Sequence, residues 1–235
     1  MRSIAKLMKD WQFTGPNGVT TAVELPHTWN AKDGQDGGND YWRGCCTYCT
    51  RFAAPVYDPA QQQVWLQFEG VNASAAVLLN GQQLCTHDGG YSTFRAEVTE
   101  LLQAENQLTV RVDNSVNDRV YPQKADFTFY GGIYRDVSLL VVNKNHIALG
   151  HFGDTGVKIT PALQENSADI RVETLVEGSG TVTVELLDAE GRTVAKGEGE
   201  NTFLHLDAPH LWNGVKDPYL YTCIVRLLQD GQPVD

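Results

Sequence analysis

The sequence predicts an all-β protein built as two β-sandwiches, and three observations support that prediction. Apolar residues alternate with polar ones at the period of a β-strand in many short segments. No segment has the apolar spacing of an amphipathic helix of three turns. Turn-forming pairs such as Asn80-Gly81 lie between alternating segments, which is typical of antiparallel strands joined by tight turns.

Residues 1–143 are predicted to form the larger sandwich, with a jelly-roll topology. Strand alternation is clear in residues 64–69 and again in residues 108–113. Residues 76–85 predict a β-hairpin, because the central Asn80-Gly81 pair tolerates the positive φ of a tight primed turn. Residues 99–102 predict a single helical turn.

Residues 144–235 are predicted to form a smaller immunoglobulin-like sandwich, with the linker near residues 143–146. Its strands are short and follow one another at roughly 8–12 residues. It lacks the Cys…Trp…Cys spacing of antibody domains. Residues 229–235 resemble a hairpin turn that enters a strand which is then cut off, so we expect this sandwich to be truncated at its C-terminal end.

Composition limits the classes of partner. Of the 235 residues, 42% are hydrophobic and 20% are charged, as in an ordinary globular protein, and the net charge is −11. An acidic chain without basic patches argues against nucleic acid or an anionic membrane as a partner. The first residues do not form a secretory signal, so we expect a cytoplasmic protein with reduced thiols at its five cysteines.

The stretch DFTFYGGIYRDVSLL, residues 126–140, is the most informative part of the chain. It places a carboxylate, aromatic rings and the flexible Gly131-Gly132 pair directly ahead of an apolar strand. Aromatic rings stack on the apolar faces of sugars, and a carboxylate accepts hydrogen bonds from their hydroxyls, so Asp126 is a candidate sugar ligand. Alternatively, Asp126 caps a turn or pairs with Arg119 or Lys124.

A second candidate is the glycine-rich stretch of residues 33–44 that follows LPHTWN. Its glycines indicate a long surface loop, and such loops often carry function. Asn39 and Asp40 are the candidate sugar ligands there. A calcium loop is the rival interpretation of its aspartates, although their spacing misses the usual pattern. We predict no metal and no cofactor.

These motifs resemble the family 2 glycoside hydrolases, the group of β-galactosidases and β-glucuronidases. Asp126, Gly131, Gly132, Ile133, Tyr134 and Arg135 match a family motif in order, and LPHTWN and YWRG resemble its N-terminal domain. The resemblance implies a galactose-binding-like jelly roll followed by an immunoglobulin-like domain. It also implies that Asp126 reaches into the substrate pocket and that the ligand is a carbohydrate, with a β-galactoside favoured.

The resemblance further implies a retaining hydrolase whose two catalytic glutamates lie on a TIM barrel of the same polypeptide, outside this chain. We therefore expect this chain alone to contain no catalytic residue and to be inactive, and to wall the active site of its parent enzyme. The parent's oligomeric state, including a homo-oligomer, stays open. Two other interpretations are a free-standing carbohydrate-binding module and a structural pair of sandwiches without sugar binding.

Overall fold

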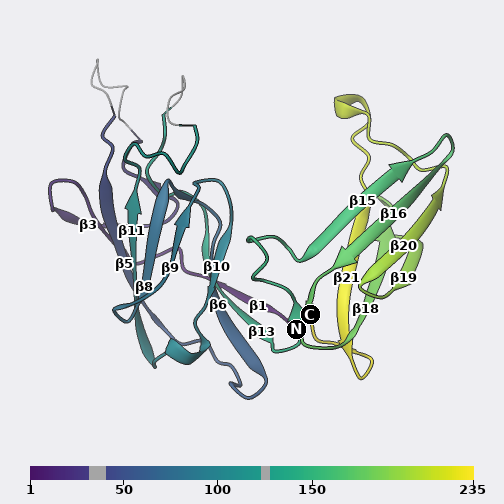
Figure 1. Cartoon of the computed structure of the whole chain (residues 1–235), viewed down its shortest axis with the longest axis horizontal. Coiled ribbons are helices and arrows are strands. Elements are labelled where there is room, and N and C mark those ends of the chain that lie inside the picture. The colour runs from purple at the N-terminus through teal and green to yellow at the C-terminus, as the bar shows by residue number, and fades with distance from the viewer. Residues whose placement is uncertain (32–40, 123–127) are drawn as a thin grey trace. The chain divides into compact units, whose positions relative to one another are not determined.

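The computed structural model describes residues 1–31, 41–122 and 128–235 (Figure 1). Apart from two short 3-10 turns, its regular elements are β-strands, which confirms the predicted all-β class. The contacts divide the chain into two compact units, Ser3–Val141 and a second unit that joins Met1–Arg2 to Val142–Asp235.

Two antiparallel sheets form the first sandwich. The larger has six strands in the order β3 (Thr20–Val23), β2 (Trp11–Thr14), β5 (Cys45–Ala53), β11 (Glu105–Asp113), β8 (Ser74–Leu79) and β9 (Gln82–Asp88). The smaller has four strands in the order β1 (Ser3–Lys6), β13 (Val137–Asn143), β6 (Gln62–Phe68) and β10 (Phe94–Glu97).

The core of this sandwich follows from the strand alternation. In β6 and β11 every second side chain is buried, and in β6 these are Val64, Leu66 and Phe68, all fully buried. Because successive side chains of a strand point to opposite faces, these two strands each turn one apolar face into the core. Cys46 lies on the buried face of β5, where burial raises the pKa of its thiol to about 12. The five cysteines are free thiols.

A third, small sheet places the loops of the candidate site. It consists of β4 (His27–Thr28), β12 (Gly132–Ile133) and β7 (Val71–Asn72), with β12 in the middle. Gly132 has a φ of 141°, and a Cβ there would lie 2.4 Å from the carbonyl oxygen of His27. Glycine is therefore required where this sheet closes.

Two further predicted elements of the first sandwich are confirmed. Strands β8 and β9 pair up to Leu79 and Gln82, which leaves Asn80-Gly81 as a two-residue turn. The φ angles of this pair, 52° and 83°, are both positive, as the primed turn requires. The predicted helical turn is the 3-10 turn η1 (Thr99–Leu101).

The second unit has its own sheets and its own core. Its strands are β14 (His146–Ile147) with β17 (Val176–Glu177); β15 (Val157–Leu163), β16 (Ser167–Thr174) and β20 (Asn201–Asp207); and β19 (Thr193–Glu198), β18 (Thr181–Leu187), β21 (Thr222–Gln229) and β22 (Gln232–Pro233). Residues such as Val172, Val184 and Leu227 are buried between these sheets. A second 3-10 turn, η2 (Gly214–Lys216), lies between β20 and β21.

The described part of the chain contains no helix long and apolar enough to cross a membrane. In the same residues, no group of three histidine, cysteine or acidic side chains is placed to hold a metal ion.

Candidate functional site

The three candidate sugar ligands, Asp126, Asn39 and Asp40, lie outside the described residues. The residues on either side of them are described, and they converge at one end of the first sandwich. These flanking segments are residues 28–31 and 41–44 around the first loop, and residues 113–122 and 128–132 around the second. The candidate site is therefore described through the points where its two loops are rooted.

Two buried asparagines join the roots of both loops. Asn30 is 1% exposed and Asn114 is fully buried, and the Asn114 amide nitrogen donates to the Asn30 side-chain oxygen at 3.1 Å. That oxygen also accepts from the backbone nitrogen of Gly131 at 2.7 Å. The Asn30 amide nitrogen donates to the carbonyl oxygen of Trp42 at 2.8 Å. Asn30 thus ties the two sides of the first loop to the end of the second.

Asn114 completes this network from the end of β11. Its amide nitrogen also donates to the carbonyl oxygen of Phe129 at 3.1 Å, and its side-chain oxygen accepts from the backbone nitrogen of Gly44 at 2.8 Å. A buried polar group that lacks a partner is costly, so amides that each satisfy several backbone groups hold those groups in one arrangement. We call Asn30, Asn114 and their backbone partners the loop-root network.

Close packing around Gly131 adds to the rigidity of the loop roots. A Cβ on Gly131 would lie 2.1 Å from Cζ2 of Trp29, so no other residue fits there without moving the ring. Trp29 in turn stacks on Phe13 and meets Trp42 edge-on, with ring centroids 6.0 Å apart in both pairs. The glycine of the motif is therefore required by contact with an aromatic side chain.

Arg43, in the root of the first loop, contacts the root of the second loop. Its Nε donates to the carbonyl oxygen of Asn114 at 2.8 Å. Its guanidinium carbon lies 5.4 Å from the centroid of the Phe129 ring, within the range of a cation–π contact. The arginine of the YWRG element therefore has a structural role at this site.

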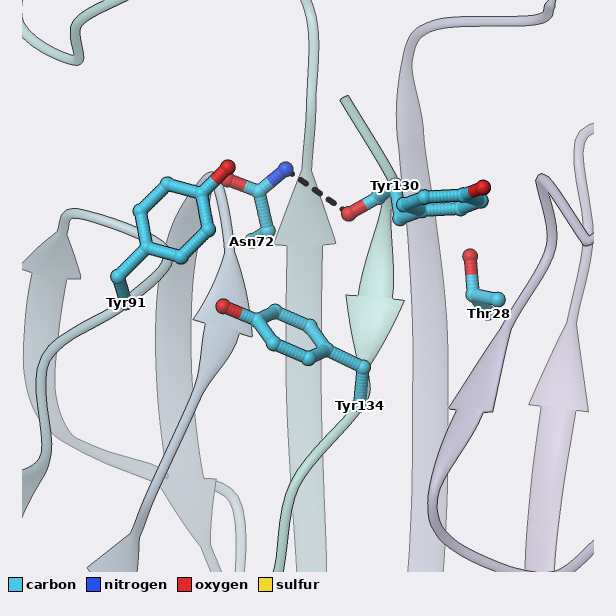
Figure 2. A pocket seen from close by; sticks show the side chains of 5 residues that line it. All are labelled: Thr28, Asn72, Tyr91, Tyr130 and Tyr134. Carbon is cyan, nitrogen blue, oxygen red and sulfur yellow. Dashed lines mark hydrogen bonds between the residues drawn. The ribbon is translucent and has the colours of Figure 1, made fainter. Parts of the chain in front are cut away.

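A pocket of about 250 Å³ opens beside the second loop root, in the region of the small sheet. Five residues line it, namely Thr28, Asn72, Tyr91, Tyr130 and Tyr134 (Figure 2). Figure 2 shows Asn72 between Tyr91 and Tyr130, where its amide nitrogen donates to the carbonyl oxygen of Tyr130 at 2.8 Å. We call this the tyrosine pocket.

In the small sheet, the half-buried His27 of β4 forms a polar pair with the fully buried Tyr48 of β5. The hydroxyl of Tyr48 lies 2.7 Å from Nδ1 of His27, and the His27 ring packs against Phe13 at 4.8 Å between centroids. Burial lowers the pKa of His27 and raises the pKa of Tyr48. Both groups are therefore neutral near pH 7, and the pair supports β4 without placing a charge under the site.

Of the two alternative partners considered for Asp126, Lys124 lies outside the described residues, and Arg119 is engaged with another carboxylate. The Nε of Arg119 lies 2.9 Å from Oδ2 of Asp88, and the hydroxyl of Ser74 donates to the other oxygen of that carboxylate at 2.5 Å. The Ser74 hydrogen bond is the largest cause that lowers the pKa of Asp88, and Arg119 adds to it. Asp88 is thus an ionised acceptor, unsuited to donate a proton. His87 has a structural role, stacked on Phe94 at 4.2 Å between centroids.

Sequence reasoning missed most of the described site. The motif of residues 126–140 contains Tyr130 and Tyr134, whereas Asn114, Asn72, Tyr91 and Thr28 are not predicted as site residues from the sequence. Local signals are weak for these residues, because contacts between segments distant in the sequence bring them to the site. A polar residue at the end of an alternating strand, as Asn114 is, was the one available hint.

Comparison with known families matches both units. Residues 38–162 match the glycosyl hydrolase 2 galactose-binding domain-like family, and residues 151–235 match the glycosyl hydrolases family 2. A β-glucuronidase from Bacteroides fragilis is 33% identical over an alignment of 251 positions, which covers 97% of this chain and 36% of that protein. A β-galactosidase from Thermoanaerobacter pseudethanolicus is 29% identical over an alignment of 191 positions, which covers 74% of this chain and 25% of that protein.

Solved structures also match the whole length of this chain. An FMN-binding β-glucuronidase from Facaelibacterium prausnitzii L2-6 superposes with a TM-score of 0.93 and 34% identity, over 100% of this chain and 38% of that one. A β-glucuronidase from Ruminococcus gnavus, at 22% identity and a TM-score of 0.81, shows the same fold over 100% of this chain and 44% of its own. The chain thus spans 36% of the length of the first curated relative named above and 25% of the second.

Proposed function

The chain belongs to family 2 of the glycosyl hydrolases and corresponds to the N-terminal sugar-binding and immunoglobulin-like domains of that family. From that premise we propose that it forms one wall of the active site of a retaining β-glycosidase. The parent enzyme would hydrolyse terminal β-glycosides. The chain itself would contribute hydrogen bonds to the terminal sugar and exclude water, while its parent's other domain supplies the two catalytic carboxyl groups. We propose that the isolated chain has no hydrolase activity.

The loop-root network is the observation that carries this proposal. It fixes the ends of both loops that carry Asp126, Asn39 and Asp40, through amides that are almost fully buried. A carboxylate contributes most to catalysis when it is held in place before the substrate arrives, since the ordering cost is then already met. Rigid roots beneath candidate ligands favour a substrate-binding role over a purely structural pair of sandwiches.

Two sugars are candidates for the substrate of the parent enzyme. The motifs of the sequence favour a β-galactoside, and a curated relative with that activity covers 74% of the chain. A β-glucuronide is the second candidate, because the β-glucuronidase from Bacteroides fragilis is more similar and covers 97%. The rates of the parent enzyme on 4-nitrophenyl β-D-galactoside and 4-nitrophenyl β-D-glucuronide decide between them.

The role of Asp126 is tested by substitution in the longer enzyme that contains this chain. One charge-assisted hydrogen bond is worth about 1.5–3 kcal/mol, so Asp126→Ala is expected to lower kcat/KM at least tenfold. Asp118→Ala, which removes an exposed aspartate from the same region, is the matched control and is expected to leave kcat/KM unchanged. A loss below twofold for Asp126→Ala would refute the proposed role.

A further inference from the structure

The polar groups that line the tyrosine pocket are largely engaged within the protein. The hydroxyl of Thr28 donates to the carbonyl oxygen of Gly131 at 2.8 Å, and the amide nitrogen of Asn72 donates to that of Tyr130 at 2.8 Å. The hydroxyl of Tyr134 donates to the carbonyl oxygen of Gly90. Three polar side chains in the wall are therefore already committed to the backbone.

What remains for a ligand is aromatic surface with few free polar atoms. Among the described residues, the hydroxyls of Tyr91 and Tyr130 have no hydrogen-bond partner, and these two side chains are 53% and 43% exposed. The rings of Tyr91 and Tyr134 meet edge-on, 6.4 Å apart with 66° between their planes. Figure 2 shows the three rings around one opening. Aromatic rings favour other rings in edge-to-face or offset contact.

The size of the pocket suits a single substituted ring. Its volume is about 250 Å³. Apolar cavities of about 150 Å³ already hold benzene, so a benzene ring with one substituent fits within the tyrosine pocket. A pyranose of similar size fits less well chemically, because it carries a hydroxyl on most of its carbons. Each hydroxyl that is buried without a partner costs about tenfold in affinity.

We infer that the tyrosine pocket binds one aromatic ring bearing a single hydroxyl or ether oxygen. The ring would pack against Tyr91, Tyr130 and Tyr134, and its one oxygen would meet the free hydroxyl of Tyr91 or Tyr130. Two molecules carry this chemistry, a free phenol and the aryl end of an aryl β-glycoside. This inference concerns binding by the chain itself, and it stands independently of the proposed role of Asp126.

The test is ligand binding to the full 235-residue chain, measured by saturation-transfer and fluorine NMR titration. The probes are 4-fluorophenol, 4-fluorophenyl β-D-galactoside and 4-fluorophenyl β-D-glucuronide, with cyclohexanol and methyl β-D-galactoside as probes that lack an aromatic ring. We expect an aryl probe to bind at least tenfold more tightly than either ring-free probe. Comparable binding of methyl β-D-galactoside would overturn the inference in favour of a sugar pocket.

Two variants locate the binding. Tyr91→Ala removes an exposed ring, so the fold should tolerate it, and it is expected to weaken aryl binding about three- to tenfold. Phe203→Ala removes a 73% exposed ring of β20 in the other unit and should change nothing. An equal effect of the two variants, or none for Tyr91→Ala, would refute the assignment.

The choice of aryl probe identifies the source of the ring. If either 4-fluorophenyl glycoside binds at least as tightly as 4-fluorophenol, the natural ligand is the aryl end of a glycoside. If 4-fluorophenol alone binds, the natural ligand is a free phenol. Failure of every aryl probe would overturn the inference and leave the proposed function intact, because the assay requires no hydrolysis.

Discussion

At the scale of single residues, the two buried asparagines decide how the candidate site is held. Asn30 and Asn114 come from segments 84 positions apart, yet each side chain bonds to the other and to backbone groups of the loop roots. A buried amide with all its hydrogen bonds made adds little net stability, whereas removing it strands several backbone groups at once. Replacing either asparagine is therefore expected to cost more stability than the small net contribution of its own hydrogen bonds suggests.

Substitution of Asn114 tests that argument. Asn114→Ala leaves the amide of Gly44 and the side-chain oxygen of Asn30 short of a partner, and we expect it to lower the free energy of unfolding by about 2–3 kcal/mol. Urea denaturation followed by tryptophan fluorescence measures the change. The exposed Asn166→Ala is the matched control and should remain within about 0.5 kcal/mol of the parent chain.

The half-buried His27 predicts a dependence of stability on pH. Burial lowers its pKa in the folded state below the ordinary 6.5, so the unfolded chain binds the proton more readily. Its contribution to stability is therefore complete above pH 6.5 and is lost as pH falls through the folded-state pKa. Burial lowers the pKa of His87 as well, which gives a second contribution of the same sign.

We expect the free energy of unfolding to decrease between pH 7.5 and pH 5 for this reason, and His27→Gln to make that decrease smaller while leaving the part due to His87. Urea denaturation across this pH range provides the measurement. If the parent chain and His27→Gln lose stability in parallel, proton binding by His27 is not the cause.

At the scale of elements, the hairpin of β8 and β9 shows how a local signal acquires a tertiary role. Its turn residue Asn80 has the positive φ that the sequence pair predicts, and its side-chain oxygen also accepts from the backbone nitrogen of Gln107 at 2.9 Å. The Asn80 amide nitrogen donates to the carbonyl oxygen of Leu101 at 3.1 Å and to Asn106 at 3.0 Å. The turn is thereby attached to η1 and to the start of β11.

Gly81 is the residue to substitute in this hairpin. Its φ of 83° is unfavourable for any residue with a Cβ, although nothing lies within 4 Å of the position a Cβ would take. Gly81→Ala is therefore expected to cost about 1–2 kcal/mol through backbone strain alone, measured by urea denaturation. The neighbouring Gln82→Ala, at an exposed strand position, should cost much less, and equal losses would argue against strain at the turn.

At the scale of the whole molecule, the two units have separate cores, and the second unit also uses the start of the chain. The guanidinium of Arg2 binds the carboxylate of Asp235 through two hydrogen bonds, of 3.0 and 2.6 Å. The same carboxylate accepts from the backbone nitrogen of Ile147 at 2.9 Å, and the Asp235 side chain is only 6% exposed. Residues 233 positions apart thus belong to one unit.

Breaking this ion pair should destabilise the second unit selectively. Arg2→Met leaves a nearly buried carboxylate without its cation, and we expect a loss of about 2–3 kcal/mol there. Hydrogen exchange at the amides of Ile147 and Leu227 reports on that unit. Lys6→Met is the control: the Lys6 side chain is 64% exposed in its ion pair with Asp136 of the first unit, where water screens the pair, so its loss should leave the protection of these two amides unchanged. Equal protection of the Ile147 and Leu227 amides in the two variants would contradict the expected selective destabilisation of the second unit.

The sequence by itself determined the fold class, the order of the two sandwiches, the Asn80-Gly81 turn and the helical turn near Thr99. These features depend on alternation and on the backbone preferences of adjacent residues, which are local properties of the chain. The family motif of residues 126–135 is also a local feature of the sequence, and its described part, residues 128–135, contributes Phe129 and Gly131 to the loop-root network and Tyr130 and Tyr134 to the tyrosine pocket.

Only the tertiary structure decided which side chains meet there. Asn30 reaches Asn114, and Thr28, Asn72, Tyr91 and Tyr130 surround one pocket, because β4, β7 and β12 pair although they are far apart in sequence. Strand order and register determine which side chains come into contact. A shift of one residue in the pairing register of a strand would turn all its side chains to the opposite face. That choice results from the packing of the whole sandwich, so no short segment of the sequence contains it.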